Sequence, residues 1–134
     1  MSWFSPYFGL VLVDEVVGNL QSQKNIVLDA RSNDRYHGQN ETLDPIGGHI
    51  PGAINRFFKD NLSASAFKTP EQLYQDFLAI LGSTKAPEVI HSCGSGVTAC
   101  HNLLAMEVAG LKGSRLYAGS WSEWCSNPDR PIEL

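Results

Sequence analysis

Residues 89–98, Val-Ile-His-Ser-Cys-Gly-Ser-Gly-Val-Thr, carry the pattern that decides the fold. Four residues of strand character, 89–92, run into a short loop with two glycines, and a helical pattern begins at about Thr98. A strand, a tight loop and a helix start direct several backbone N–H groups at one point, which favours an anion there. Cys93 is the first residue of this loop, so its thiolate form is favoured and we predict Cys93 as a nucleophile. The alternative is a buried structural cysteine at a strand end, a common place for this residue.

Strand and helix patterns alternate on both sides of this stretch. Apolar runs predict five strands, over 10–13, 26–30, 53–55, 89–92 and 115–118. This alternation indicates an α/β fold built around a mostly parallel sheet. The polar segment 32–52, which contains four glycines, is predicted to be a loop with little regular structure.

Three helices are predicted between these strands. The clearest begins at Thr69-Pro70-Glu71, where a capping residue precedes proline at the first helical position, and ends at Gly82. Another begins at Asp14 as its cap and is interrupted by Gly18. The third covers 98–108, and its buried face is predicted from Leu103, Leu104 and Val108, with Cys100 packed inside as well.

Composition limits the class of protein. The chain has 134 residues, 43% of them hydrophobic and 18% charged, which fits one folded domain over residues 1–134. Ten basic residues against 14 acidic ones give no basic field, so nucleic acid is not expected as a partner. The apolar run 3–13 is too short to span a bilayer and lacks a basic region before it, so no membrane association is expected. Three cysteines without Cys-x-x-Cys spacing argue against a disulfide framework or structural zinc, and thiols fit a reducing, cytoplasmic compartment.

Four segments in one order resemble the rhodanese family. They are Leu28-Asp29-Ala30-Arg31 followed by Arg35-Tyr36, the stretch 48–55 (Gly-His-Ile-Pro-Gly-Ala-Ile-Asn), the Cys93 loop with Thr98-Ala99-Cys100-His101, and 119–124 (Gly-Ser-Trp-Ser-Glu-Trp). In particular, the chain is similar to the C-terminal, catalytic half of two-domain enzymes that use thiosulfate or 3-mercaptopyruvate. The resemblance implies a three-layer α/β/α fold with a central, mostly parallel sheet of five strands.

The resemblance also implies a sulfurtransferase reaction. The Cys93 thiolate takes a sulfane sulfur from a small-molecule donor, becomes a persulfide, and passes the sulfur to cyanide or another thiol, including a thioredoxin-like protein. No metal and no organic cofactor is required. The four histidines also lack metal-ligand spacing with a cysteine, apart from the adjacent Cys100-His101.

Substrate-binding residues follow from the same resemblance. They are the loop residues Gly94, Ser95, Gly96, Val97 and Thr98, together with Arg35 and Trp121. Gly94 and Ser95 stand where 3-mercaptopyruvate enzymes carry Gly-Ser or Gly-Thr and thiosulfate enzymes typically carry Arg-Lys, which favours 3-mercaptopyruvate. Arg35 matches the arginine that reaches the donor's anionic end, and a guanidinium suits a carboxylate. The second arginine usual before the Gly-His-Ile-Pro-Gly stretch is absent.

Other functions stay open at this point. The related cysteine phosphatases need a longer loop closed by arginine, whereas Ala99 follows Thr98 here, which disfavours a phosphatase. A non-enzymatic sulfur carrier or regulatory module that docks to a partner protein is the main alternative. The two-domain enzymes have an N-terminal half that this chain lacks, so it is expected to be either a single-domain carrier or a fragment of such an enzyme, with a partner rhodanese domain. Cys125 is either a resolving thiol or, as we favour, incidental.

Overall fold

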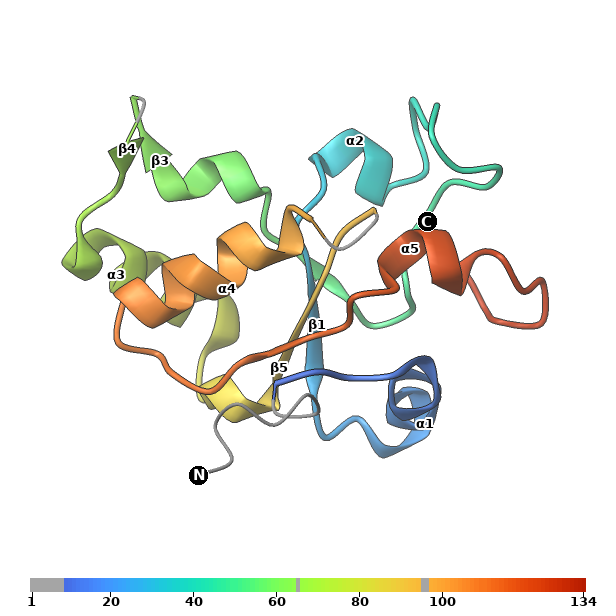
Figure 1. Ribbon diagram of the computed structural model, residues 1–134, viewed down its shortest axis with the longest axis horizontal. Coiled ribbons are helices and arrows are strands. Elements are labelled where there is room, and N and C mark those ends of the chain that lie inside the picture. Colours follow the sequence, from blue (N-terminus) through green and yellow to red (C-terminus); the bar gives the residue numbers. More distant parts are fainter. Residues whose placement is uncertain (1–8, 65, 95–96) are drawn as a thin grey trace.

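The computed structural model describes residues 9–64, 66–94 and 97–134. Its centre is a four-stranded sheet in the order β2-β1-β5-β6 (Figure 1). These strands are β1 (Ile26–Asp29), β2 (Ile54–Asn55), β5 (Val89–Ser92) and β6 (Arg115–Leu116). All three pairings are parallel, so the carboxyl ends of the strands meet at one edge of the sheet. The predicted α/β class and parallel sheet are confirmed.

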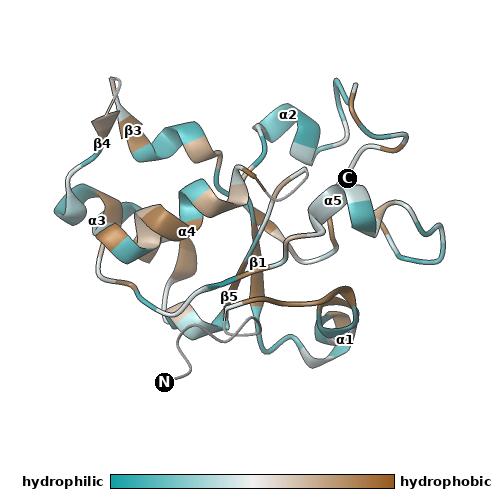
Figure 2. Ribbon diagram, viewed as in Figure 1, coloured by the Kyte–Doolittle hydropathy of each residue, from teal (hydrophilic) through white to brown (hydrophobic). Residues whose placement is uncertain are grey.

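Helices cover both faces of the sheet and complete the three layers. One face carries α1 (Val13–Ser22) and α5 (Ser120–Trp124), and the other carries α3 (Pro70–Leu81) and α4 (Ala99–Val108), as Figure 1 shows. Successive strand residues point to opposite faces, so Val27 packs in the core under α1 and Leu28 in the core under α3. Figure 2 shows β1 and β5 as the hydrophobic centre, with hydrophilic residues on α2 (Asn33–Tyr36).

The predicted strand over 10–13 is reduced to a single bridge at the sheet edge. Leu10 forms an isolated parallel bridge with Leu116, and the Val11 N–H donates to the Leu116 carbonyl at 2.8 Å. Leu12 is then the N-cap of α1, without a side-chain cap, so the predicted cap at Asp14 is also wrong. Asp14 instead lies in the first helical turn, where a carboxylate is stabilised by the helix dipole.

Helix α3 is where the sequence placed it. The Thr69 hydroxyl accepts a hydrogen bond from the Gln72 N–H at 3.3 Å, and the Gln72 side chain accepts one from the Thr69 N–H at 3.1 Å. This capping box satisfies N–H groups that have no partner within the helix. The helix ends at Gly82, as predicted.

Helix α4 buries a different face from the predicted one. Leu104 is 52% exposed and Val108 37% exposed, and Cys100 is exposed as well. The buried residues are Ala99, Asn102, Ala105 and Met106. Small alanine side chains let the helix lie close to the sheet, and the Asn102 amide donates to the Arg56 carbonyl at 2.8 Å. The large aliphatic residues therefore do not mark the contact face.

Several short elements were not predicted. Helix α2 lies inside the segment expected to be an irregular loop, and α5 follows β6 after residues 117–119. The others are the 3-10 helices η2 (Phe58–Asn61) and η3 (Ala86–Glu88) and the antiparallel pair β3 (Leu62–Ser63) and β4 (Ala66–Phe67). Among the helices described, none is long and apolar enough to cross a membrane.

Candidate functional site

The candidate site lies at the carboxyl edge of the sheet. Asp29 at the end of β1 pairs in register with Ser92 of β5 and with Asn55 of β2. Cys93 follows Ser92 directly, and α2, α5 and the start of α4 gather at this end of the sheet (Figure 1). Ligands of open parallel sheets bind at this edge, because the loops that leave the strands converge there.

Helix α5 holds the backbone of the Cys93 loop. The Cys93 N–H donates to the Ser120 hydroxyl at 3.0 Å, and the Cys93 carbonyl accepts from the Trp121 N–H at 2.9 Å. The Gly94 carbonyl accepts from the Ser122 N–H, also at 2.9 Å. Three consecutive residues of α5 therefore fix the position from which the thiol projects.

Cys93 itself is 1% exposed and packs with Ala30 and Ala99. Two of the predicted binding residues in this loop, Ser95 and Gly96, lie outside the described residues. Val97 is 75% exposed, and Thr98 is the N-cap residue of α4 without a side-chain cap. The sulfur therefore lies at the inner end of a loop whose outer side reaches solvent.

A cavity of about 240 Å³ adjoins this loop. Its walls are formed by Arg35, Leu43, Asp44, Gly94, Val97, Thr98 and Ser122. The nearest atom to the place where a Cβ would stand on Gly94 is Nη2 of Arg35, at 3.5 Å. The fold thus brings Arg35, which lies 58 positions before Cys93 in the numbering, against the residue that follows the cysteine. A larger cavity, of about 580 Å³, lies beside Ile26 at the start of β1, away from the carboxyl edge of the sheet.

Arg35 already has a carboxylate partner. Its Nη2 is 3.2 Å from Oε2 of Glu41, whose side chain is 6% exposed. The N–H groups of Leu43 and Asp44 donate to the same oxygen at 2.9 and 3.0 Å. Burial works against ionisation of Glu41, but these backbone hydrogen bonds and Arg35 outweigh it, so the pKa of Glu41 lies below its ordinary value. Glu41 is therefore a carboxylate at neutral pH, and it holds both Arg35 and the turn at 43–44.

The sequence of this chain matches the model of a known protein family. The rhodanese-like domain model matches residues 12–127. The chain belongs to the rhodanese family. A probable 3-mercaptopyruvate sulfurtransferase of Pseudomonas aeruginosa is 52% identical over 107 residues, which are 79% of this chain and 38% of that protein. The thiosulfate sulfurtransferase of Mus musculus is 39% identical over 115 residues, 83% of this chain and 38% of its own length.

Comparison with solved structures finds the same fold in a sulfurtransferase. The 3-mercaptopyruvate sulfurtransferase from Leishmania major superposes with a TM-score of 0.76 at 32% identity, covering 92% of this chain and 34% of that one. The chain therefore spans little more than a third of the length of these rhodanese relatives.

Trp121, which the resemblance predicts to bind substrate, is buried beside this rhodanese site. It is 1% exposed and is not among the residues that line the cavity. Its indole N–H donates to the Ile46 carbonyl at 2.8 Å, and the Arg31 guanidinium carbon lies 5.0 Å from its ring centroid. Trp121 thus joins α5 to the loop that carries Glu41 and Asp44, and its predicted contact with substrate stays a prediction.

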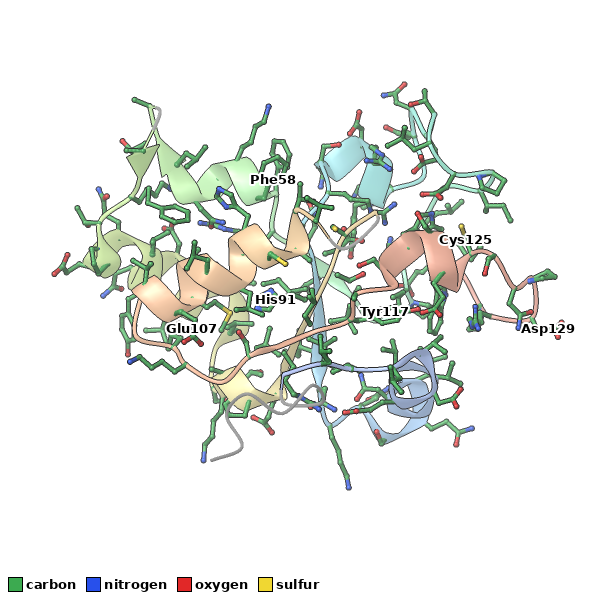
Figure 3. All side chains as sticks on the ribbon, in the orientation of Figure 1. Phe58, His91, Glu107, Tyr117, Cys125 and Asp129 are labelled. Atoms are coloured by element: carbon green, nitrogen blue, oxygen red, sulfur yellow. The ribbon has the colours of Figure 1, made fainter. Side chains whose placement is uncertain are left out.

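The remaining cysteines and histidines lie away from the cavity walls. Cys125 is buried beside α5 (Figure 3), and burial first, then the charge of Asp44, raises the pKa of its thiol. His91 is fully buried in β5, with Nε2 3.0 Å from the Ser114 hydroxyl. In the described ranges no group of three or more His, Cys, Asp or Glu residues could hold a metal ion.

Sequence reasoning missed four polar residues of the site. These are Glu41, Asp44, Ser120 and Ser122. Glu41 and Asp44 stand in a polar loop without periodicity, where no local pattern shows which carboxylate turns inward. The serines belong to the quoted stretch 119–124, but their role depends on hydrogen bonds to Cys93 and Gly94, which only the folded chain shows.

Proposed function

We propose that this chain is a sulfurtransferase that carries sulfur on Cys93. The observation that supports it most is the position of Cys93: it opens the loop at the carboxyl edge of the sheet, is fixed by α5, and adjoins a cavity that contains Arg35. Relatives named 3-mercaptopyruvate and thiosulfate sulfurtransferase share this domain at 52% and 39% identity.

In the first half-reaction, Arg35 binds the anionic group of the donor and the Cys93 thiolate attacks its sulfur. With 3-mercaptopyruvate, the bond between carbon and sulfur breaks and its electron pair stays on carbon. That carbanion takes a proton to give pyruvate, while Cys93 keeps the sulfur as a persulfide. The persulfide is an anion, so N–H groups at the start of α4 stabilise it as they stabilise the thiolate.

In the second half-reaction, a nucleophile removes the outer sulfur. Cyanide or a thiolate, free or on a thioredoxin-like protein, attacks that sulfur, the S–S bond breaks, and its electron pair returns to Cys93. No external oxidant or reductant is needed, because the carbon of 3-mercaptopyruvate keeps the electron pair of the first bond that breaks and Cys93 takes back the electron pair of the second.

The cavity favours 3-mercaptopyruvate over thiosulfate as the donor. Thiosulfate carries two negative charges. Among the described residues that line the cavity, Arg35 is the one with a positive charge, and it is already paired with Glu41. Asp44 adds a second carboxylate to the same wall. We therefore expect a higher kcat/KM for 3-mercaptopyruvate, and a higher value for thiosulfate contradicts this assignment of the donor.

Intact-mass measurement tests the function directly. After incubation with 3-mercaptopyruvate and removal of excess donor, the wild type should gain one sulfur atom, and addition of cyanide should remove it as thiocyanate. Cys93→Ser should gain none, whereas Cys100→Ser and Cys125→Ser should behave as the wild type. A Cys93→Ser protein that still turns over moves the nucleophile elsewhere. A wild type that gains sulfur but passes it to no small acceptor is a sulfur carrier and not an enzyme.

A further inference from the structure

His49 is a buried histidine outside the cysteine loop, and both of its ring nitrogens face oxygen atoms. The residue is 3% exposed. Nδ1 lies 2.7 Å from the carbonyl oxygen of Tyr36, and Nε2 lies 3.1 Å from Oε1 of Glu133, in the C-terminal segment 131–134. The Tyr36 ring stacks on the imidazole with 3.7 Å between the ring centroids. The orientation of the imidazole is therefore fixed by its face as well as by its nitrogens.

The two oxygen atoms accept hydrogen bonds and donate none. A backbone carbonyl is an acceptor in every state. The hydrogen bond from the Gly52 N–H, and then the contact with His49, lower the pKa of the Glu133 carboxyl, so it is a carboxylate at neutral pH. A neutral imidazole has one N–H group and one lone pair, so it satisfies one oxygen and turns its lone pair toward the other. Only the imidazolium, with two N–H groups, donates to both.

His91 shows the opposite arrangement in the same fold. It is also buried, but its Nε2 faces the Ser114 hydroxyl at 3.0 Å, which can donate as well as accept, and its Nδ1 has no hydrogen-bond partner. Burial lowers the pKa of His91 to about 3. The two buried histidines should therefore differ in charge at neutral pH, because their partners differ and not because of burial as such.

Two titratable side chains of the helix α2 region lie against the His49 ring. Burial, and then the charges of Asp29 and Glu133, raise the pKa of Tyr36, so this phenol stays neutral. His37 is exposed, and its ring centroid lies 6.2 Å from that of His49, edge to face. Neither side chain supplies a negative charge, so Glu133 is the carboxylate that contacts the ring.

Arg31 brings a positive charge to the same region. Its Nη2 donates to the carbonyl of Gly48, the residue before His49, at 2.6 Å. The same nitrogen lies 2.7 Å from Oδ2 of Asp29, and Nη1 lies 3.7 Å from Oε1 of Glu41. Because these two carboxylates offset the guanidinium, its repulsion of a charged His49 is small.

The side-chain contact ties the C-terminal segment to one wall of the cavity. His49 and Glu133 also exchange two backbone hydrogen bonds, at 2.8 and 2.9 Å. His49 lies immediately after the 38–48 loop, and two residues of that loop, Leu43 and Asp44, line the cavity beside the cysteine loop. The protonation of the ring is therefore connected, through the segment and the loop, to the wall of the candidate site.

We propose that the His49–Glu133 contact is a pH-dependent closure of this cavity wall. While the ring holds both protons, it fastens the C-terminal segment to the 38–48 loop. When the ring releases one proton to solvent as the pH rises, a lone pair faces an oxygen atom, the segment separates more often, and the loop that lines the cavity opens with it. The consequence for sulfur transfer rests on the proposed function, whereas the closure itself does not.

The direction of the pH dependence follows from the number of bound protons. Below about pH 6.5 a histidine carries its second proton whether the segment is closed or open. Above about pH 6.5 the open form loses this proton and the closed form keeps it, so the contact stabilises the closed form less as the pH rises. The ratio of open to closed molecules should then increase by up to about tenfold per pH unit.

NMR spectroscopy of the full chain measures the charge and the closure separately. At about pH 7 the ring-nitrogen chemical shifts should show His49 as an imidazolium and His91 as neutral. The protection of the Glu133 N–H from hydrogen exchange, corrected for the intrinsic effect of pH, should fall by up to about tenfold per pH unit between about pH 7 and 9. The N–H groups of Leu43 and Asp44 should lose protection over the same range.

Glu133→Gln removes the need for the second proton. Its amide N–H can donate to Nε2 of a neutral His49, while Nδ1–H still donates to the Tyr36 carbonyl. In this variant His49 should be neutral at about pH 7, and the protection of residue 133 should stay constant between about pH 7 and 9. Glu71→Gln, which removes one exposed charge on α3, is the matched control and should behave as the wild type.

Each contrary result overturns the inference. A neutral His49 in the wild type at about pH 7 does so without any variant, even if Glu133→Gln fails to fold. Protection at Glu133 that is independent of pH in the wild type, or that falls equally in Glu133→Gln, removes the role of the proton. Constant protection at Leu43 and Asp44 while the segment opens disconnects it from the cavity wall. None of these measurements needs turnover, so a failure of the proposed sulfurtransferase function appears separately, in the intact-mass measurement.

Discussion

Arg35 combines a structural contact with a position beside the Cys93 loop. Its guanidinium bonds to Glu41 and also lies 3.5 Å from where a Cβ of Gly94 would stand. In the proposed reaction a donor anion therefore shares the guanidinium with Glu41. Because no other cation lines the described part of the cavity, the attraction of an anionic donor depends on this residue.

We expect Arg35→Ala to lower kcat/KM for 3-mercaptopyruvate by about ten- to a hundredfold, since hydrogen bonds to a charged group contribute about 1.5 to 3 kcal/mol. Arg35→Lys should recover part of this loss, because an ammonium keeps the charge but not the planar fork. Steady-state kinetics measures both.

Arg115→Ala is the matched control for these kinetics. Arg115 forms a comparable ion pair with Glu15, at 2.7 Å, and lines no part of the cavity beside Cys93. Its loss should change the free energy of unfolding by about 1 kcal/mol or less and leave kcat/KM as it is. A folded Arg35→Ala protein with unchanged kcat/KM removes Arg35 from the site.

Among the elements, those with local signals were predicted well. The helix α3 has its cap, proline and terminal glycine in the sequence, and the structure confirms all three. Helix α4 has no continuous stripe of large aliphatic residues: its buried residues are Ala99, Asn102, Ala105 and Met106, so the prediction from Leu104 and Val108 was wrong. The inner side of the 38–48 loop could not be predicted, because its path is set by contacts with residues near the C-terminus.

Helix α1 contains a glycine that the fold does not use. Gly18 lies in its middle, and a Cβ added there meets nothing within 4 Å. Alanine loses less backbone freedom on folding than glycine, so Gly18→Ala should raise the free energy of unfolding by about 0.5 to 1 kcal/mol. Urea unfolding measures this. A decrease contradicts the helical conformation of residue 18.

Strand β5 carries a histidine that links stability to pH. Burial lowers the pKa of His91 from 6.5 to about 3. Between these two values the unfolded chain binds a proton that the folded chain does not. The free energy of unfolding should therefore be unaffected by His91 above about pH 6.5 and fall as the pH falls below it, with a limiting slope of about 1.4 kcal/mol per pH unit.

We expect His91→Gln to remove this part of the pH dependence, whatever its effect on stability at neutral pH. The measurement is urea unfolding at several pH values between about 4.5 and 7.5. His37→Gln, which changes an exposed histidine, is the control and should keep the wild-type slope. Parallel curves for the wild type and His91→Gln contradict a neutral, buried His91.

At the scale of the whole molecule, the C-terminal segment closes over the loop that carries Glu41 and Asp44. His49 and Glu133 exchange two backbone hydrogen bonds, at 2.8 and 2.9 Å, across 84 positions of the chain. The Gly48 carbonyl also accepts from Nη2 of Arg31 at 2.6 Å. The cavity wall is thus held by the segment that ends the chain as well as by α5.

Gly48 is the point where this closure is tightest. Its φ is +125°, and a Cβ there would lie 2.6 Å from Cγ2 of Ile132 and 2.9 Å from the Glu133 carbonyl oxygen. Gly48→Ala therefore meets both backbone strain and a clash with the Ile132 side chain and the Glu133 carbonyl oxygen, and should lower the free energy of unfolding by about 2 to 4 kcal/mol. Urea unfolding measures the loss, and hydrogen exchange at Glu133 reports whether the C-terminal segment opens.

Gly82→Ala separates the clash from the strain. Gly82 also has a positive φ, +58°, but a Cβ there meets nothing within 4 Å. Its substitution should cost about 1 kcal/mol, from strain alone. If the C-terminal segment positions the cavity wall, Gly48→Ala should also lower kcat/KM for 3-mercaptopyruvate at temperatures where the protein is folded, whereas Gly82→Ala should not. Equal losses of stability in the two variants, with Glu133 still protected from exchange, contradict the tight contact between Gly48 and the C-terminal segment.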